Sequence, residues 1–219
     1  MIRNLTAAIL IAFLTVSCAS ADVAVSFSGT NLGFADGESR MLGWEFTVGG
    51  SDLRVTDLGF QDFNVDGLLE SHEVGIWRLS DQALITSAVV PSGTAGTLDG
   101  FFRYQTISTT ATLDSGTTYV IAGLDRGIDP HVWDVEIAGF PNRSVNDFSV
   151  NPLVSIGAPG TAYGPFQGAF GFPVSFGDPV GRAALLGPNF RFSTVPEPSA
   201  AVLLTLIGLG CCTRRRRRS

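Results

Sequence analysis

Acidic and amide side chains recur at regular intervals between residues 62 and 73. Counting Asp62 as position 1, side-chain oxygens fall at positions 1, 3, 5, 9 and 12, and a glycine falls at position 6. With this spacing the side chains converge on one point, glycine permits the sharp turn, and Ca²⁺ accepts about six to eight such oxygens. We therefore predict a calcium site with the following ligands: Asp62, Asn64, Asp66, the Leu68 carbonyl, Glu70 and Glu73.

The spacing is that of a complete EF-hand loop, but the sequences on both sides of it are typical of strands rather than helices. We therefore expect a calcium loop set between two strands. The alternative is an ordinary hairpin loop in which the same carboxylates are solvated.

Other signatures of catalytic chemistry are poor. His72 and Glu73 begin like a zinc-binding helix motif, but the second histidine of that motif is absent, and His131 is the only other histidine. The sequence contains no nucleophile elbow and no glycine-rich phosphate loop. Trp44, Trp77 and Trp133 could line a sugar platform, but each lies at an alternating strand position, so we interpret them as core. We therefore predict that the protein is not an enzyme.

Alternating apolar and polar residues predict that the chain is built from strands. Leu42, Trp44, Phe46 and Val48 follow a period of two, which indicates a half-buried strand. No stretch between residues 22 and 195 has a sustained period of 3.6. The fold class is therefore all-β, a single antiparallel β-sandwich of jelly-roll or immunoglobulin-like type. Further strands are expected at 23–27, 53–60 with a bulge near Asp57, 73–79, 83–90 as a hairpin partner, 101–107, 117–123, 131–138 and around Phe190 and Phe192.

Tyr119 follows a glycine-containing corner at the start of one of these strands. This arrangement resembles the tyrosine corner of Greek-key sandwiches, in which the hydroxyl bonds back to upstream backbone. The alternative is an ordinary strand aromatic. Residues 139–188 are rich in proline and glycine yet carry six phenylalanines, so we expect ordered loops and short strands packed over the sandwich rather than a linker.

The N-terminal residues 1–21 have the pattern of a signal peptide. Arg3 supplies the positive charge, residues 5–16 form the apolar region, and Ala19 and Ala21 frame a cleavage site, so the mature chain is expected to begin at Asp22. The alternative is lipoprotein processing at Cys18, but Thr15 stands where an aliphatic residue is required.

The C-terminal residues 196–219 have the pattern of a sorting tail. Pro196, Glu197 and Pro198 precede an apolar stretch at 199–212, and a basic cluster follows, made of Arg214, Arg215, Arg216, Arg217 and Arg218. A helix over the apolar stretch would span roughly 21 Å, less than the ~30 Å hydrocarbon core of a bilayer. We therefore expect a temporary anchor whose arginines stay in the cytoplasm. The alternatives are an ordinary short anchor or a buried helix.

The order of these tail features resembles the PEP-CTERM sorting signal of Gram-negative bacteria. This resemblance implies that an exosortase cuts the tail near Pro196 to Pro198, after signal peptidase has acted at the other end. It further implies transient residence in the inner membrane, then the outer cell surface or the extracellular matrix. The tail therefore predicts a location and no activity.

A second, weaker resemblance covers roughly residues 29–123. The segments that carry it lie at 55–60, 66–68, 71–77, 100–104 and 113–119. They look like a secreted β-sandwich domain of unknown function that often precedes PEP-CTERM tails. This resemblance implies a fold and an extracellular setting.

Charge and cysteine content fit this expected setting. Once both ends are removed, residues 22–195 keep 8 arginines, no lysine and 19 acidic residues, a net charge of −11. Such an acidic surface disfavours nucleic acid and anionic lipid as partners. Cys18, Cys211 and Cys212 all lie in the removed ends, so the mature domain has no disulfide.

Three functions are compatible with the sequence. We expect a structural or adhesive surface protein associated with exopolysaccharide. The alternatives are a carbohydrate-binding module and a secreted polysaccharide hydrolase that uses paired carboxylates.

Overall fold

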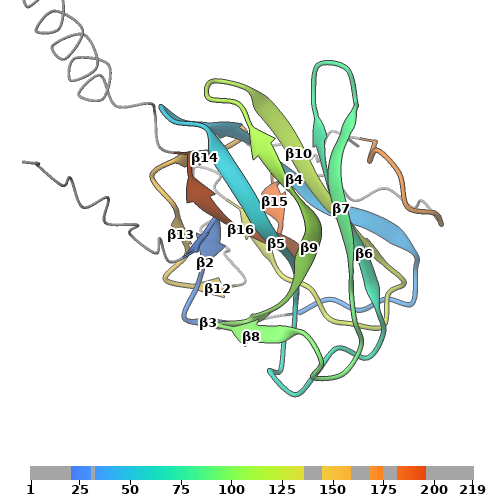
Figure 1. The fold of residues 1–219 in the computed structure, drawn as a ribbon. Coiled ribbons are helices and arrows are strands. Elements are labelled where there is room, and N and C mark those ends of the chain that lie inside the picture. The colour runs from blue at the N-terminus through green and yellow to red at the C-terminus, as the bar shows by residue number, and fades with distance from the viewer. Residues whose placement is uncertain (1–20, 31–32, 136–144, 159–167, 175–181, 196–219) are drawn as a thin grey trace, which may run out of the picture.

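The computed structural model describes residues 21–30, 33–135, 145–158, 168–174 and 182–195. All regular structure in these ranges is β-strand (Figure 1). The strands are β1 (Asp22–Val23), β2 (Val25–Ser26), β3 (Gly29–Thr30), β4 (Arg40–Val48), β5 (Leu53–Gln61), β6 (His72–Arg78), β7 (Leu84–Val90), β8 (Thr97–Asp99), β9 (Phe102–Leu113), β10 (Thr118–Asp125), β11 (Trp133–Val135), β12 (Val145–Asn146), β13 (Ser149–Val150), β14 (Val154–Ile156), β15 (Arg182–Leu185) and β16 (Pro188–Thr194).

Two antiparallel sheets hold most of the chain. The first has the order β1-β16-β5-β9-β8, and the second has the order β11-β15-β4-β10-β6-β7, with β14 also paired to β4. Buried side chains from both sheets form one core cluster, including Trp44 and Phe46 from the second sheet and Phe60 and Phe190 from the first. The predicted all-β, antiparallel class is therefore confirmed.

Strand β4 shows why the alternating pattern specifies this arrangement. Leu42, Trp44, Phe46 and Val48 are at most 1% exposed, and all belong to the core between the sheets. Because a strand sends successive side chains to opposite faces, a period of two puts this whole set on one side. Each side chain contributes roughly 1.5–3 kcal/mol by leaving water. The prediction for 42–48 is confirmed.

Strand β5 carries the predicted bulge. Its register against β9 shifts between Val55 and Asp57, and its register against β16 shifts at the matching point. An extra residue changes the phase of the alternation, so that Val55 and Leu58 both face the core.

Strands β6 and β7 form the predicted hairpin. They pair from His72 with Val90 to Trp77 with Leu84, and one register shift precedes the turn. Gln82 in the turn has a φ of 58°, and Arg78 donates a 2.8 Å hydrogen bond to Asp81.

The corner before β10 is the predicted tyrosine corner. The N–H of Asp114 donates a 2.8 Å hydrogen bond to the hydroxyl oxygen of Tyr119, whose side chain is fully buried. A loop N–H is thereby satisfied by a side chain that is anchored in the core.

Other strands differ from prediction in length. The expected strand at 23–27 is divided, because Val23 pairs with β16 whereas Val25 pairs with Val150 of β13. Strand β9 continues to Leu113, well beyond the expected end at residue 107. The strand expected at 131–138 is described only as β11, and residues 136–138 lie outside the described ranges.

The proline-rich region contributes short strands where it is described. Strands β12, β13 and β14 add to β3, β2 and β4 respectively. Phe170 and Phe172 pack on Trp77 on the outer face of the second sheet, away from the main core. Phe140, Phe166 and Phe176 lie outside the described residues, as do the signal-peptide segment 1–20 and the tail 196–219.

Candidate functional site

One end of the sandwich collects most of the buried charge of the described chain. Strand β6 begins there, β10 ends there, and the connections 62–71 and 126–132 meet beside them. The buried polar residues of this end are Gln61, Asp62, His72, Arg103, Asp125, Asp129 and His131. Buried charges need partners, so each contact in this group matters for the fold.

His72 is the centre of the group. Its ring is fully buried and stacks on Phe60 of the opposite sheet, with centroids 3.6 Å apart and planes 4° from parallel. Nδ1 lies 2.9 Å from the Leu124 carbonyl, and Nε2 lies 2.9 Å from Oδ2 of Asp129. The ring therefore joins β6, the end of β10 and the following loop.

Asp129 receives hydrogen bonds from three groups. The N–H of Leu69 donates to Oδ1 at 2.9 Å, and the N–H of Glu70 and His72 Nε2 approach Oδ2 at 3.1 Å and 2.9 Å. Burial alone would raise the pKa of the Asp129 carboxyl. The hydrogen bonds from His72, Leu69 and Glu70 outweigh burial, and the pKa lies below its usual value.

The two ring nitrogens of His72 both face oxygen acceptors, one a carbonyl and the other a carboxylate. A neutral imidazole donates one N–H, whereas a doubly protonated ring donates to both oxygens at once. Asp129 is thus the charged partner of a buried ring that has an acceptor at each nitrogen.

Glu70 closes the group toward solvent. Its Oε1 accepts a 2.9 Å hydrogen bond from the N–H of Arg126, and Oε2 lies 3.7 Å from the Arg126 guanidinium. Arg126 also donates to the Ser71 carbonyl. The connections 62–71 and 126–132 are thus joined through both backbone and side chains.

Glu70, His72 and Asp129 also form the one described group of three His, Cys, Asp or Glu residues with ligand atoms within 4.8 Å of one another. By donor chemistry, two carboxylates and an imidazole would suit a transition metal better than Ca²⁺. The donor atoms that face one another here are already hydrogen-bonded, however. The arrangement has the geometry of a charged hydrogen-bond network.

A second buried pair lies next to this network. His131 Nδ1 is 3.4 Å from Oδ2 of Asp125, and neither atom has a hydrogen-bond partner among the described residues. The other Asp125 oxygen accepts from the N–H of Gly127, and Gln61 Oε1 accepts from the N–H of Val132. Both histidines of the chain therefore lie beside aspartates at the same end of the sandwich.

Of the predicted calcium ligands, Asp62 has the best-defined alternative partner. Its Oδ2 accepts a 2.7 Å hydrogen bond from Arg103 Nε and a 3.0 Å bond from the N–H of Gly67. The Asp62 and Arg103 side chains are 2% and 5% exposed. The carboxylate expected at position 1 of the calcium loop is thus neutralised by an arginine from β9.

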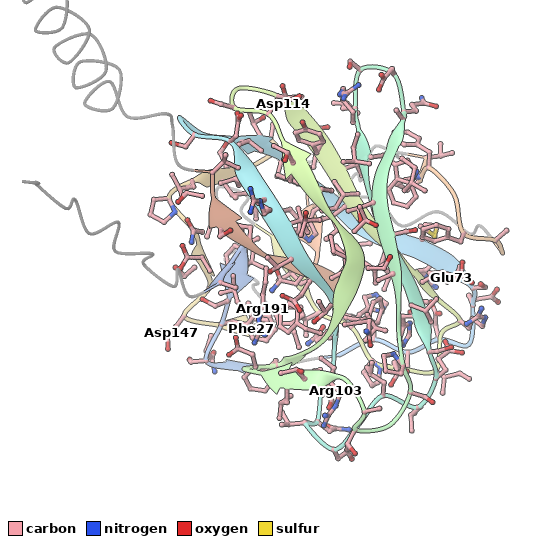
Figure 2. All side chains as sticks on the ribbon, in the orientation of Figure 1. Phe27, Glu73, Arg103, Asp114, Asp147 and Arg191 are labelled. Atoms are coloured by element: carbon pink, nitrogen blue, oxygen red, sulfur yellow. The ribbon has the colours of Figure 1, made fainter. Side chains whose placement is uncertain are left out.

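Two of the other predicted ligands have partners elsewhere, and the rest differ in face or exposure. The Leu68 carbonyl accepts from the N–H of Gly93 at 2.6 Å, and Glu70 bonds to Arg126. Glu73 follows His72 on β6, so its side chain leaves the opposite face of the sheet; Figure 2 shows Glu73 and Arg103 well apart. Asn64 and Asp66 are exposed. Calcium binding stays a prediction from the sequence.

Two tryptophans considered for a sugar platform are core residues. Trp44 is fully buried and donates its indole N–H to the Pro188 carbonyl, and Trp77 is 3% exposed beneath Phe170 and Phe172. The Trp133 side chain lies outside the described side chains. The interpretation of Trp44 and Trp77 as core is confirmed.

The sequence reasoning missed Asp129 and Arg103. Neither belongs to a motif, and each partner lies far away along the chain, Asp129 from His72 by 57 residues and Arg103 from Asp62 by 41. The residues of the signal-cleavage and sorting predictions, Ala19, Ala21, Pro196 to Pro198 and Arg214 to Arg218, lie outside the described residues.

No protein-family model matches this chain, and comparison with curated proteins gave no match. Among the described residues there is no helix long and apolar enough to cross a membrane.

Proposed function

We propose that this protein is exported and works at the outer cell surface or in the extracellular matrix, as a structural or adhesive component associated with exopolysaccharide. The observation that carries the proposal is the ordered tail: Pro196 to Pro198, the apolar stretch 199–212, then five arginines. In this proposal signal peptidase releases the chain after Ala21, and an exosortase removes the tail after transient insertion in the inner membrane.

The composition of the domain supports this setting. Between residues 22 and 195 it has no cysteine and a net charge of −11, which keep it soluble and independent of the redox state outside the cell. The polar network around His72 and Asp129 supplies internal ties in place of disulfides. We interpret this network as one that stabilises the fold, because its polar groups bond to one another.

The experiment changes the charge of the tail while keeping its length. Replacing the five arginines at 214–218 with glutamine in the native cells should give misplaced protein that keeps its tail, because glutamine no longer resists translocation and no longer holds the tail in the inner membrane. Replacing them with lysine keeps the charge and is the matched control, which should be processed as the wild type. Normal release of a tail-less product from the glutamine variant would refute the proposal.

A further inference from the structure

The edge strands of the two sheets differ in the features that prevent pairing with another chain. The strand orders end at β1 and β8 in the first sheet and at β11 and β7 in the second. β1, β8 and β11 have two or three residues each and contain Asp22, Asp99 and Asp134 respectively. Short length and charge are the usual protections of an exposed edge.

β7 has neither protection. It has seven residues, Leu84–Val90, with the sequence Leu-Ile-Thr-Ser-Ala-Val-Val, and it contains no proline and no charge. Leu84 is 49% exposed and Val89 is 55% exposed. Strong β-propensity without charge is typical of segments that pair readily with other strands.

The outer side of β7 makes no backbone hydrogen bond to the residues that the structure describes. Within the described chain, its backbone hydrogen bonds go to β6 alone. In an antiparallel pair, the N–H and C=O groups of alternate residues point away from the partner. β7 therefore presents a row of donors and acceptors along its free side.

Two neighbouring stretches at this edge contain no charged residue, from Gln82 to Leu98 and from Tyr104 to Leu113 in β9. β8 covers β9 only as far as Tyr104, and the rest of β9 runs beside β7 (Figure 1). The charged residues beside them belong to the adjacent strands, such as Glu73, which is paired with Val89. This flank, made of 82–98 and 104–113, thus places no charge of its own at the β7 edge.

We infer that β7 is the site of self-association, at which two copies of this chain pair their β7 strands antiparallel across a two-fold axis. Two copies of the domain 22–195, each with a net charge of −11, repel each other. They can approach through this flank without placing like charges opposite each other. The pairing also satisfies the free backbone groups and extends the second sheet from one copy into the other.

The sequence fixes the register of this pairing. An antiparallel two-fold pairing that uses all seven residues must be centred on Ser87, which then lies opposite Ser87 of the other copy. Leu84 then faces Val90, and Ile85 faces Val89. Opposed Cα atoms in such a pair are about 4.5–5.5 Å apart, which is within the range that a disulfide spans, about 4.4–6.8 Å.

The test uses cysteine cross-linking in the full chain. With Cys18, Cys211 and Cys212 replaced by serine, Ser87→Cys provides a single thiol at the centre of β7. Ser80→Cys is the matched control, because Ser80 is an exposed serine in the turn of the same hairpin. In the inferred register the two turns lie at opposite ends of the pair, so Ser80→Cys measures only random or tail-driven encounters.

On mild oxidation we expect Ser87→Cys to give a disulfide-linked dimer and Ser80→Cys to stay monomeric. Equal cross-linking of both variants, or none at Ser87→Cys, would overturn the inference. Species larger than dimers would contradict the two-fold arrangement, because a two-fold contact uses both β7 strands and stops at the dimer, whereas a non-closing contact produces larger assemblies.

A second test checks the same contact by charge, without a covalent cross-link. Ser87→Lys and Ser87→Glu each place like charges opposite each other and should sediment as monomers, while an equal mixture of the two should form a heterodimer. Unchanged circular dichroism in both variants shows that the fold is intact. The inference does not rest on the proposed function, because it concerns the purified chain and not its location.

Discussion

Replacing Asp129 with asparagine tests whether the buried network holds this end of the sandwich together. Asparagine keeps the shape, but it removes the negative charge that faces His72 and replaces one acceptor oxygen with an NH₂ group. The buried His72 ring or a backbone N–H of Leu69 or Glu70 then loses its acceptor.

The expected loss of stability follows from the burial of both His72 and Asp129. The His72 side chain is 0% exposed and the Asp129 side chain is 6% exposed, so water screens the pair little. Leaving a buried donor without its acceptor costs about 1–3 kcal/mol. For a domain of this size, about 2–4 °C is lost per kcal/mol, and the melting temperature should fall by roughly 2–12 °C.

The assay is urea denaturation followed by circular dichroism, with the free energy of unfolding taken at constant m-value. Asp81→Asn is the control, because Asp81 also bonds to a basic side chain, Arg78, but is exposed. Its loss should be much smaller than that of Asp129→Asn, because water and salt screen an exposed pair. In a double-mutant cycle with His72→Gln, the double variant should lose clearly less than the sum of the single losses. A loss below about 1 kcal/mol for Asp129→Asn, or additive losses in the cycle, would refute a buried hydrogen-bonded pair that stabilises the fold.

Four further predictions concern separate features. Because the pKa of Asp129 is lowered in the folded state, its contribution to stability is complete above its unfolded value and is lost as the pH falls below about 4; acid titration of unfolding should therefore be shallower for Asp129→Asn than for the wild type, and parallel curves would contradict this. Tyr119→Phe removes the hydroxyl that accepts from the Asp114 N–H and should cost about 1–2 kcal/mol in the same denaturation assay, whereas a neutral change would mean that water replaces it. Arg103→Met leaves the Asp62 carboxylate buried without its cation and should cost about 3–5 kcal/mol, against a small effect of the exposed-site control Arg78→Met. The sequence predicts that millimolar calcium raises the melting temperature above that in chelator, while the pairing of Asp62 with Arg103 favours no change; scans of the wild type in both conditions decide between them.

Local patterns in the sequence were sufficient for several features of the fold. The alternation from Leu42 to Val48 predicts the core face of β4, because side-chain direction in a strand depends only on position. The bulge near Asp57, the β6–β7 hairpin and the Tyr119 corner are likewise set by residues close together in sequence. Each was predicted because its cause lies within a few residues of its effect.

The candidate site could not be predicted in the same way. The motif between residues 62 and 73 specifies oxygen ligands within one segment. It contains no information about a cationic side chain that another strand places beside them. Arg103 comes from β9 and pairs with Asp62, and Asp129 comes from a later loop and pairs with His72. The division of the first strand has a similar cause, since β13, which pairs with Val25, lies more than a hundred residues further on.

The most direct test of the proposed function is mass spectrometry of the mature protein recovered from outside its native cells. The account predicts a chain that begins at Asp22 and ends near Pro196 to Pro198, with no peptide from the apolar stretch or the arginine cluster. Recovery of an extracellular chain that still carries residues 199–219 would contradict it.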